Sequence, residues 1–169
     1  MLSRIKGGLT LKIVILRGNS GSGKTTIAKK LQEILGEKAI LISQDVLRRK
    51  MLLPDAVVGE MSVKLNQAIV DFSVQHFEYI IIEGIYSNKK HGKWLKEYTQ
   101  KFESYAYYFD ISFEETLLRH QNKVDANFGK EEMEQWYIKN DVLGIKNEKI
   151  ILEKYTIEDT VSLILDDIY

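Results

Sequence analysis

The stretch Gly18-Asn19-Ser20-Gly21-Ser22-Gly23-Lys24-Thr25 matches the pattern G-x-x-x-x-G-K-[ST] at every fixed position. Glycines let the backbone wrap closely around a phosphate group, so that successive N–H groups point at the anion. In this pattern the lysine reaches the β- and γ-phosphates, and the hydroxyl of the last residue holds Mg²⁺. The stretch therefore predicts a phosphate-binding loop for a nucleoside triphosphate.

The segments on both sides of the loop have the patterns that such a loop requires. Residues 11–16 form a short apolar run rich in β-branched side chains, which is typical of a buried strand. Residues 25–35 place apolar side chains on one face of a helix, namely Ile27, Ala28, Leu31, Ile34 and Leu35. The N-terminus of that helix would point at the phosphates. A chance glycine-rich turn is the alternative, and this strand–loop–helix context argues against it.

Nucleotide binding is assigned to the loop together with the first turn of the following helix. The set comprises Gly18, Asn19, Ser20, Gly21, Ser22, Gly23, Lys24, Thr25 and Thr26. Lys24 is predicted to act in catalysis, and Thr25 is predicted to be a ligand of Mg²⁺.

The composition restricts the class of protein. A length of 169 residues is close to that of one domain, so we expect a single domain over residues 1–169. The 24 basic and 24 acidic residues balance, so no global charge attracts the chain to nucleic acid or to an anionic membrane. Without cysteine, the chain has no disulfide, zinc–thiolate site or thiol nucleophile. No apolar stretch approaches the ~20 residues of a membrane span, and the N-terminus lacks the apolar core of a signal peptide, so we expect a cytoplasmic location.

Strands and helices alternate along the rest of the chain. We expect strands at 38–43, 79–83, 105–110 and 148–152. We expect helices at 45–52, 60–77, 89–102, 112–123 and 131–140, and a last helix opened by Thr156 and Asp159. This alternation predicts a parallel sheet with helices on both faces. Ligands should then gather at the carboxyl ends of the strands.

Glu83 ends the most hydrophobic of these strands. An acid in this place usually holds Mg²⁺, directly or through water. Because glutamate is longer than the usual aspartate, Glu83 could instead orient a nucleophile. An ordinary solvated end of a strand is the third interpretation.

Asp45 lies just beyond the second strand, where it could accept the proton of a substrate hydroxyl. Asp is also a preferred helix N-cap, although Ser43 could fill that role equally well. Arg48 or Arg49 could bind an anionic group of the substrate through two parallel hydrogen bonds. Both arginines could equally belong to a solvated helix face.

Arg119 and Lys123 lie four residues apart on one predicted helix, and a polar stretch follows them. We expect a short lid over residues 120–140, with both cations contacting nucleotide phosphates and Arg119 acting in catalysis. Ordinary surface charges are the alternative. Residues 122–125 also spell N-K-x-D, the guanine-reading motif, but they follow a helical pattern rather than a strand, so we reject a GTPase. The histidines, His76, His91 and His120, are interpreted as surface or helix-edge residues.

These residues together resemble the small P-loop kinases. The resemblance rests on the loop at 18–25, Asp45 after the second strand, Glu83 at the end of the third and Arg119 at the start of the lid. Within that group the chain looks most similar to the branch that contains polynucleotide 5′-kinase domains, zeta-toxin-like kinases and bacterial "uridine kinase-like" proteins. Segments at 128–133, 136–137 and 140–144 are similar to a stretch in the last of these.

The resemblance implies a three-layer α/β P-loop NTPase fold whose five-stranded parallel sheet has the order 2-3-1-4-5. It also implies ATP with Mg²⁺ and transfer of the γ-phosphoryl group to an acceptor hydroxyl. By the same resemblance, Asp45 would contact or deprotonate that hydroxyl and Arg119 would engage phosphates. The chain departs from the family pattern at Glu83, where aspartate is more usual, and in its lid, which lacks an arginine cluster.

The leading hypothesis is therefore an ATP-dependent kinase that acts on a small molecule such as a nucleoside, a sugar or a nucleotide sugar. A polynucleotide acceptor is less expected because the chain has no stripe of basic residues, although nucleic-acid 5′-ends remain open. The alternative from another class is a nucleotide-dependent regulatory or binding ATPase without a small-molecule acceptor. We expect no membrane partner, and no feature of the sequence predicts an oligomeric state.

Overall fold

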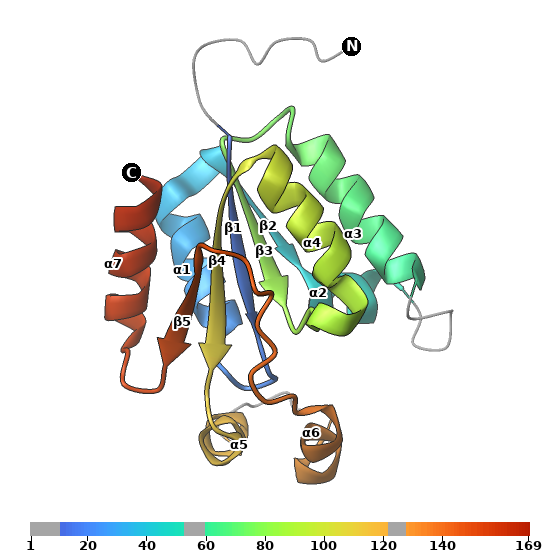
Figure 1. Cartoon of the computed structure of the whole chain (residues 1–169), viewed down its shortest axis with the longest axis vertical. Helices are drawn as coiled ribbons and strands as arrows, with labels where there is room; N and C mark the ends of the chain where they lie inside the picture. The colour runs from blue at the N-terminus through green and yellow to red at the C-terminus, as the bar shows by residue number, and fades with distance from the viewer. Residues whose placement is uncertain (1–10, 53–59, 122–127) are drawn as a thin grey trace.

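The computed structural model describes residues 11–52, 60–121 and 128–169. Five strands form one sheet, in which every neighbouring pair is parallel and the order is β2-β3-β1-β4-β5. The strands are β1 (Lys12–Gly18), β2 (Ala39–Ser43), β3 (Tyr79–Gly84), β4 (Glu103–Asp110) and β5 (Glu148–Leu152). The predicted sheet and its order are therefore confirmed (Figure 1).

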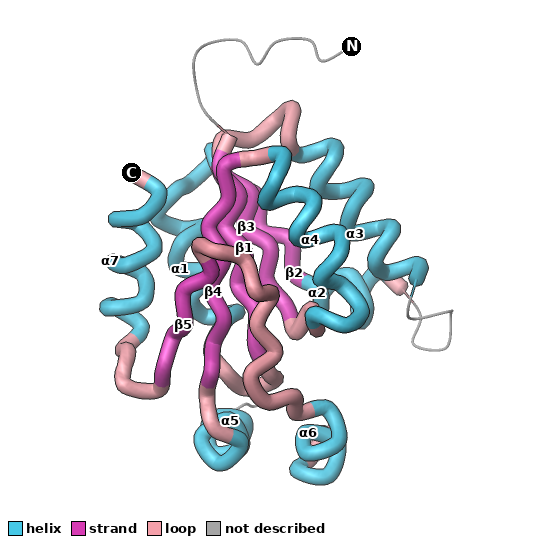
Figure 2. The backbone as a smooth tube through the Cα atoms, in the orientation of Figure 1, coloured by secondary structure: helices cyan, strands magenta, loops and turns pink. Residues whose placement is uncertain are grey.

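Helices connect these strands and cover both faces of the sheet (Figure 2). They are α1 (Lys24–Leu35), α2 (Gln44–Val46), α3 (Glu60–Ser73), α4 (Asn88–Lys101), α5 (Phe113–Gln121), α6 (Lys130–Trp136) and α7 (Ile157–Ile168). A 3-10 turn at Gly36–Lys38 precedes β2, and a π-helical turn at Leu47–Met51 follows α2. None of the helices in the described part of the chain combines the length and the apolar character needed to cross a membrane.

The sheet separates two hydrophobic cores. On one face α1 and α7 pack on the sheet, and Leu31 and Ile164 are fully buried there. On the other face α3 and α4 pack on it, and Val70 and Leu95 are fully buried there. The central strand β1 contributes Val14 and Leu16 to one core and Ile13 and Ile15 to the other, which explains why residues 13–16 are all apolar instead of alternating with polar residues.

Polar residues lie at the starts of two helices, and the predicted reciprocal pair of hydrogen bonds is complete in one of them. Thr156 Oγ1 accepts a hydrogen bond of 3.0 Å from Asp159 N, and the Asp159 carboxylate accepts one from Thr156 N in return. This reciprocal pair satisfies donors that a helix start leaves unpaired. Ser112 Oγ accepts from Glu115 N at 3.3 Å at the start of α5, but the Glu115 carboxylate binds Arg119 instead of completing the pair.

Three details of the predicted helices are wrong. Ile34 is 54% exposed, because α1 buries Ile27, Leu31 and Leu35 and leaves Ile34 at the margin of that face. Helix α3 ends at Ser73 and not at Phe77. Helix α6 ends at Trp136 instead of continuing to Asn140, and its continuation is held by contacts with the phosphate-binding loop described below.

Candidate functional site

The predicted phosphate-binding loop joins β1 to α1 at the carboxyl edge of the sheet. Gly21 has φ +81°, and a Cβ built on it would lie 2.4 Å from the carbonyl oxygen of Thr116 in α5. Gly23 has φ +97°. Only glycine adopts such angles without strain, and only glycine lets α5 approach the loop this closely. The glycines therefore allow the backbone conformation of the loop and the close packing of α5 against it.

Lys24 bends back over the loop from the first turn of α1. Its Nζ donates to the carbonyl oxygen of Asn19 at 2.7 Å and to Ser22 Oγ at 3.0 Å. The side chain is only 5% exposed. Its ammonium group is thus held within the loop, where the motif requires a cation for the β- and γ-phosphates.

Glu83 is buried at the end of β3, with 2% of its surface exposed. It accepts a hydrogen bond from Thr25 Oγ1 at 3.2 Å and a short one from Ser43 Oγ. Ser43 is level with Glu83 in the parallel pairing of β2 with β3, so the register brings these side chains together. The interpretation of Glu83 as a solvated strand end is wrong. Its carboxylate and the Thr25 hydroxyl are the hard oxygen ligands that Mg²⁺ prefers, so this pair fits the predicted ion.

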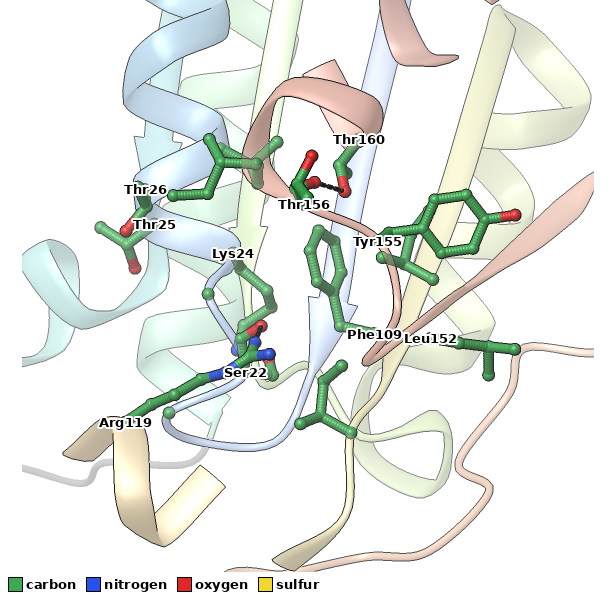
Figure 3. A pocket seen from close by; sticks show the side chains of 16 residues that line it. Ser22, Lys24, Thr25, Thr26, Phe109, Arg119, Leu152, Tyr155, Thr156 and Thr160 are labelled. Carbon is green, nitrogen blue, oxygen red and sulfur yellow. Dashed lines mark hydrogen bonds between the residues drawn. The ribbon is translucent and has the colours of Figure 1, made fainter. Parts of the chain in front are cut away.

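A first pocket of about 450 Å³ opens beside the loop. It lies between α1, the start of α7 and Arg119 of α5 (Figure 3). The loop side is lined by Gly21 to Ile27, and the opposite side by residues that include Phe109, Tyr155 and Thr160. Of the predicted nucleotide-binding residues in the described part of the chain, Gly21 to Thr26 and Arg119 line this cavity, whereas Gly18, Asn19 and Ser20 do not. The cavity is large enough for a ligand.

Arg119 connects the helix α5 to the loop. Its Nη1 donates to the carbonyl oxygen of Ser22 at 3.2 Å, and its Nε pairs with Glu115 Oε1 at 2.6 Å. The guanidinium therefore sits at the predicted position beside the phosphate-binding loop. Lys123, the second predicted cation of the lid, lies outside the described residues.

A second pocket of about 570 Å³ lies on the other side of the loop. Ser20 of the loop lines it together with Asp45, Arg48 and Arg49, the three residues predicted to contact an acceptor. Other parts of its wall come from α4 and from the end of α6, including Lys90, His91 and Trp136. The structure thus gathers the predicted acceptor residues around one cavity, separate from the first.

Asp45 does not cap a helix. The N-cap of α2 is Ser43, and Asp45 lies within the first turn with a side chain that is 63% exposed. Its Oδ1 is 3.7 Å from Arg49 Nε, one turn further along the chain. The capping interpretation of Asp45 is therefore wrong, and Asp45 lines the second pocket instead.

Gln44 and Tyr86 also line this pocket, and no motif in the sequence predicted a role for either. Gln44 Oε1 accepts hydrogen bonds from the backbone N–H groups of Ile85 at 3.0 Å and Tyr86 at 3.4 Å. Tyr86 is fully buried with φ 32°, and its hydroxyl donates to Asn66 Oδ1 at 2.7 Å. Burial raises the pKa of Tyr86 well above its ordinary value, so this donor stays protonated.

His91 lies against Tyr86 with its ring edge-on, at 5.3 Å between ring centroids. Burial lowers the pKa of His91 below its ordinary value, and the charges of Lys90, Arg48 and Arg17 add to this, against a hydrogen bond with the Ser87 carbonyl that raises the pKa. His120 is also buried, with 5% exposure, and it stacks on Phe128 at 4.5 Å. His120 is therefore at the end of a helix, as one of the two predicted alternatives has it, but it is not a surface residue, and His91 lines the second pocket.

Arg17 is the most consequential residue that the sequence analysis missed. It is the last side chain before the loop, and it is completely buried. Its guanidinium donates to the carbonyl oxygen of Tyr86 at 2.9 Å, to Glu148 Oε1 at 2.9 Å and to Asp141 Oδ2 at 3.1 Å. It also lies 5.7 Å from the centre of the Tyr108 ring. The signal that could have identified it is a lone arginine directly after the apolar run at residues 13–16.

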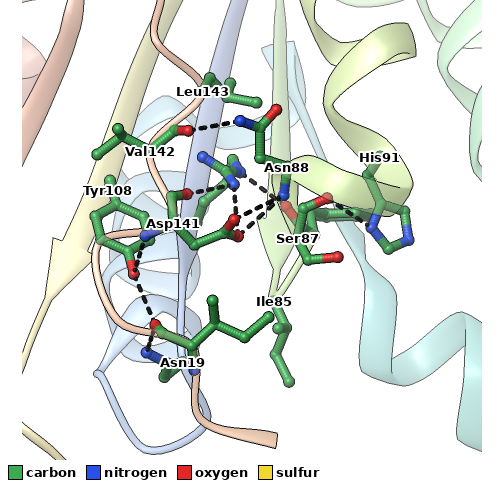
Figure 4. Close-up of polar contacts among 12 residues, drawn as sticks. Asn19, Ile85, Ser87, Asn88, His91, Tyr108, Asp141, Val142 and Leu143 are labelled. Carbon is green, nitrogen blue, oxygen red and sulfur yellow. Dashed lines mark hydrogen bonds and ion pairs between the residues drawn. The ribbon is translucent and has the colours of Figure 1, made fainter.

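The residues after α6 form a strap, residues 137–147, that runs over the sheet edge to β5. Asn19 holds it through both amide atoms, accepting from Ile138 N at 2.9 Å and donating to Ile138 O at 2.8 Å. Asp141 accepts from Asn88 N at 3.0 Å as well as from Arg17 (Figure 4). These contacts explain why the helical pattern predicted up to Asn140 ends early. They also attach the wall of the second pocket to the phosphate-binding loop.

We expect the substitution Arg17→Met to lower the free energy of unfolding by about 3–5 kcal/mol, because it leaves Asp141 and the buried Glu148 without their cation. Urea unfolding measures this change. Lys30→Met is the matched control, since Lys30 forms an exposed ion pair with Glu158 and should cost less than about 1 kcal/mol. Equal losses in the two variants would contradict the structural role of Arg17.

Solved structures with the same fold include three kinases of low sequence identity. An APS kinase from Mycobacterium tuberculosis, in complex with AMPPNP and APS, superposes with a TM-score of 0.71 at 16% identity over 94% of this chain and 98% of that one. A gluconokinase from Sinorhizobium meliloti superposes with a TM-score of 0.64 at 14% identity, over 95% of this chain and 97% of that one. A shikimate kinase from Acinetobacter baumannii, in complex with shikimate, superposes with a TM-score of 0.62 at 19% identity, over 95% of this chain and 94% of that one. These likenesses establish the fold.

No curated protein matches the sequence significantly. The family model described as an AAA domain matches residues 13–137, from β1 through the loop and α5 to the end of α6. This match covers most of the chain and includes both pockets' contacts with the loop. The chain belongs to this AAA domain family of P-loop proteins, with the fold of the small kinases.

Proposed function

We propose that this protein is an ATP- and Mg²⁺-dependent phosphotransferase that moves the γ-phosphoryl group of ATP to a hydroxyl of a small molecule. The observation that carries this proposal is the pair of pockets that meet at the phosphate-binding loop. Gly21 to Ile27 line one of them, and the adjacent Ser20 lines the other. A kinase needs a donor site and an acceptor site on the two sides of the transferred group.

In the proposed reaction the acceptor oxygen forms a bond to the γ-phosphorus. The bond from that phosphorus to the β–γ bridging oxygen breaks, ADP leaves, and the hydroxyl proton passes to the Asp45 carboxylate. Lys24 and Arg119 neutralise charge on the phosphates, because both cations contact the loop. Thr25 and Glu83 would hold Mg²⁺, which neutralises phosphate charge when bound.

The proposed working unit is a single kinase domain over residues 1–169 with residues 120–140 as its lid. In the described part of that segment, Phe128 stacks on His120 and packs against Trp136 at 5.1 Å. Arg49 lies 5.1 Å above the Phe128 ring, so a residue of the second pocket contacts the lid directly. This contact supports a lid that closes over the acceptor.

The finer relationship to polynucleotide kinases, zeta-toxin-like kinases and "uridine kinase-like" proteins stays a proposal that rests on the sequence. The solved kinases with this fold include one in complex with APS and one in complex with shikimate, both small molecules. Those structures support a small acceptor over a nucleic-acid 5′-end.

A nucleotide-dependent regulatory ATPase is the alternative, and it would use the first pocket alone. The deciding experiment is ATP turnover with Mg²⁺ in buffer and with pools of nucleosides, sugars and their acids, and 5′-hydroxyl oligonucleotides. We expect one small-molecule pool to stimulate turnover and to yield a phosphorylated product. Tight ATP binding without stimulation by any pool would favour the regulatory ATPase.

A further inference from the structure

We propose that the acceptor carries an anionic group, a carboxylate or a phosphate, which Arg48 and Lys90 bind in the second pocket. This inference rests on the proposed phosphotransferase function and specifies its substrate class. The charge of the pocket wall, the pairing of its cations and the spacing of Asp45 and Arg48 each support it.

The wall of the second pocket has more positive than negative charge. Among the described residues that line it, Asp45 is the one carboxylate, while Arg48, Arg49 and Lys90 are cations. Arg49 pairs with Asp45 at 3.7 Å and lies over the Phe128 ring. The carboxylate of Asp45 thus balances the charge of Arg49. The positive charges of Arg48 and Lys90 are not balanced by any carboxylate among the described residues that line the pocket.

Arg48 and Lys90 form no ion pair or side-chain hydrogen bond with any residue in the ranges 11–52, 60–121 and 128–169. They come from different elements, the π-helical turn and α4, and both lie close enough to His91 for their charges to lower its pKa. Two cations that line the same pocket without an ion-pair partner repel each other, and an anionic ligand between them would offset that repulsion. The half-buried guanidinium of Arg48 also matches a carboxylate or phosphate through two parallel hydrogen bonds.

The spacing of Asp45 and Arg48 sets the distance between the two groups that the acceptor must carry. Residues three apart on a helical turn lie on the same face, about 5–6 Å apart at their Cβ atoms. Asp45 would receive the proton of the hydroxyl, so the anionic group lies within about one helical turn of that hydroxyl. Sugar acids and sugar phosphates have this size, and the cavity of about 570 Å³ accommodates them.

The test measures phosphoryl transfer to related acceptors with and without an anionic group. One set is glucose, gluconate and glucose 6-phosphate, and a second pair is uridine and uridine 5′-monophosphate. We expect anionic members to have the higher kcat/KM, and the carboxylate and phosphate arms identify which anion the pocket prefers. Arg48→Gln and Lys90→Gln should raise KM for the preferred anionic acceptor about 10- to 100-fold and change kcat little.

Lys93→Gln is the matched control, because Lys93 is an exposed cation on the same helix as Lys90 and does not line the pocket. It should leave every KM unchanged. The inference is overturned if neutral members are preferred, or if Arg48→Gln and Lys90→Gln affect neutral and anionic acceptors equally. Thermal melting tests whether Arg48 and Lys90 have only a structural role. We expect Arg48→Gln and Lys90→Gln to keep the Tm of the unmodified protein, because neither substitution removes an ion pair.

A binding measurement separates failure of this inference from failure of the proposed function. With the first site saturated by AMPPNP and Mg²⁺, inorganic phosphate is titrated while the tryptophan fluorescence, to which Trp136 of the second pocket contributes, is recorded. Binding that weakens about tenfold in Arg48→Gln and Lys90→Gln, but not in Lys93→Gln, supports the anion site even if no acceptor is phosphorylated. Equal phosphate affinity in all three variants overturns it, whatever the turnover assay shows.

Discussion

The substitution Lys24→Ala is expected to abolish phosphoryl transfer, with a loss of at least about 10²-fold in kcat/KM. Lys24 is the buried cation of the phosphate-binding loop, and its ammonium is positioned by Asn19 O and Ser22 Oγ. Alanine removes the charge that stabilises the β- and γ-phosphates. Steady-state turnover measures the loss of activity, and the rise in Tm on adding ATP and Mg²⁺ measures the loss of nucleotide binding.

Lys29→Ala is the matched control for this variant, because Lys29 is an exposed lysine on the same helix. It should retain both activity and the Tm shift. Retention of both properties by Lys24→Ala would contradict the proposed use of the loop. A fall in both variants would indicate damage to α1 instead of loss of the phosphate contact.

The substitution Asp45→Asn is expected to lower kcat by about 10²–10⁴-fold while ATP affinity stays nearly unchanged. The carboxylate lines the second pocket and not the first, so its role is confined to the acceptor hydroxyl. Because the side chain is 63% exposed and its ion pair with Arg49 is at the surface, the stability cost should stay below about 1 kcal/mol. Single-turnover kinetics with saturating ATP measures the chemical step.

Arg49→Gln separates the two roles that Asp45 could have. It breaks the same ion pair but keeps the carboxylate. If Asp45 accepts the proton, Arg49→Gln should leave most of the chemical rate that Asp45→Asn removes. Equal rates in the two variants would make the ion pair the functional element, and a parallel loss of ATP affinity in Asp45→Asn would make Asp45 structural.

The sequence predicted most of the fold because its signals are local. The strand at 148–152 and the capped start of α7 at Thr156 match the structure, and the strand–loop–helix pattern around residues 18–25 was recognisable without any tertiary information. The end of α6, in contrast, could not be recognised from the sequence. Its helical pattern continues to Asn140, but two hydrogen bonds from Asn19, remote in sequence, hold Ile138 in another conformation.

The candidate site was predictable in part for the same reason. Asp45 and Glu83 were found because they follow strands, and the parallel register brings Ser43 level with Glu83. The role of Arg17 could not be predicted, because the role of a charged residue in an apolar strand depends on its partners, which the sequence does not identify. Asp141 and Glu148, more than 120 residues away in the chain, are those partners.

The sequence by itself determined the phosphate-binding loop, since eight adjacent residues and their backbone angles suffice to surround an anion. It also determined the order of strands and helices, through periodicities that span a few residues each. Only the tertiary structure decided where the second pocket lies and which cations face it. Arg48, Lys90 and Trp136 come from three separate elements, and packing across the sheet edge, together with the buried charge of Arg17, sets the positions of those elements.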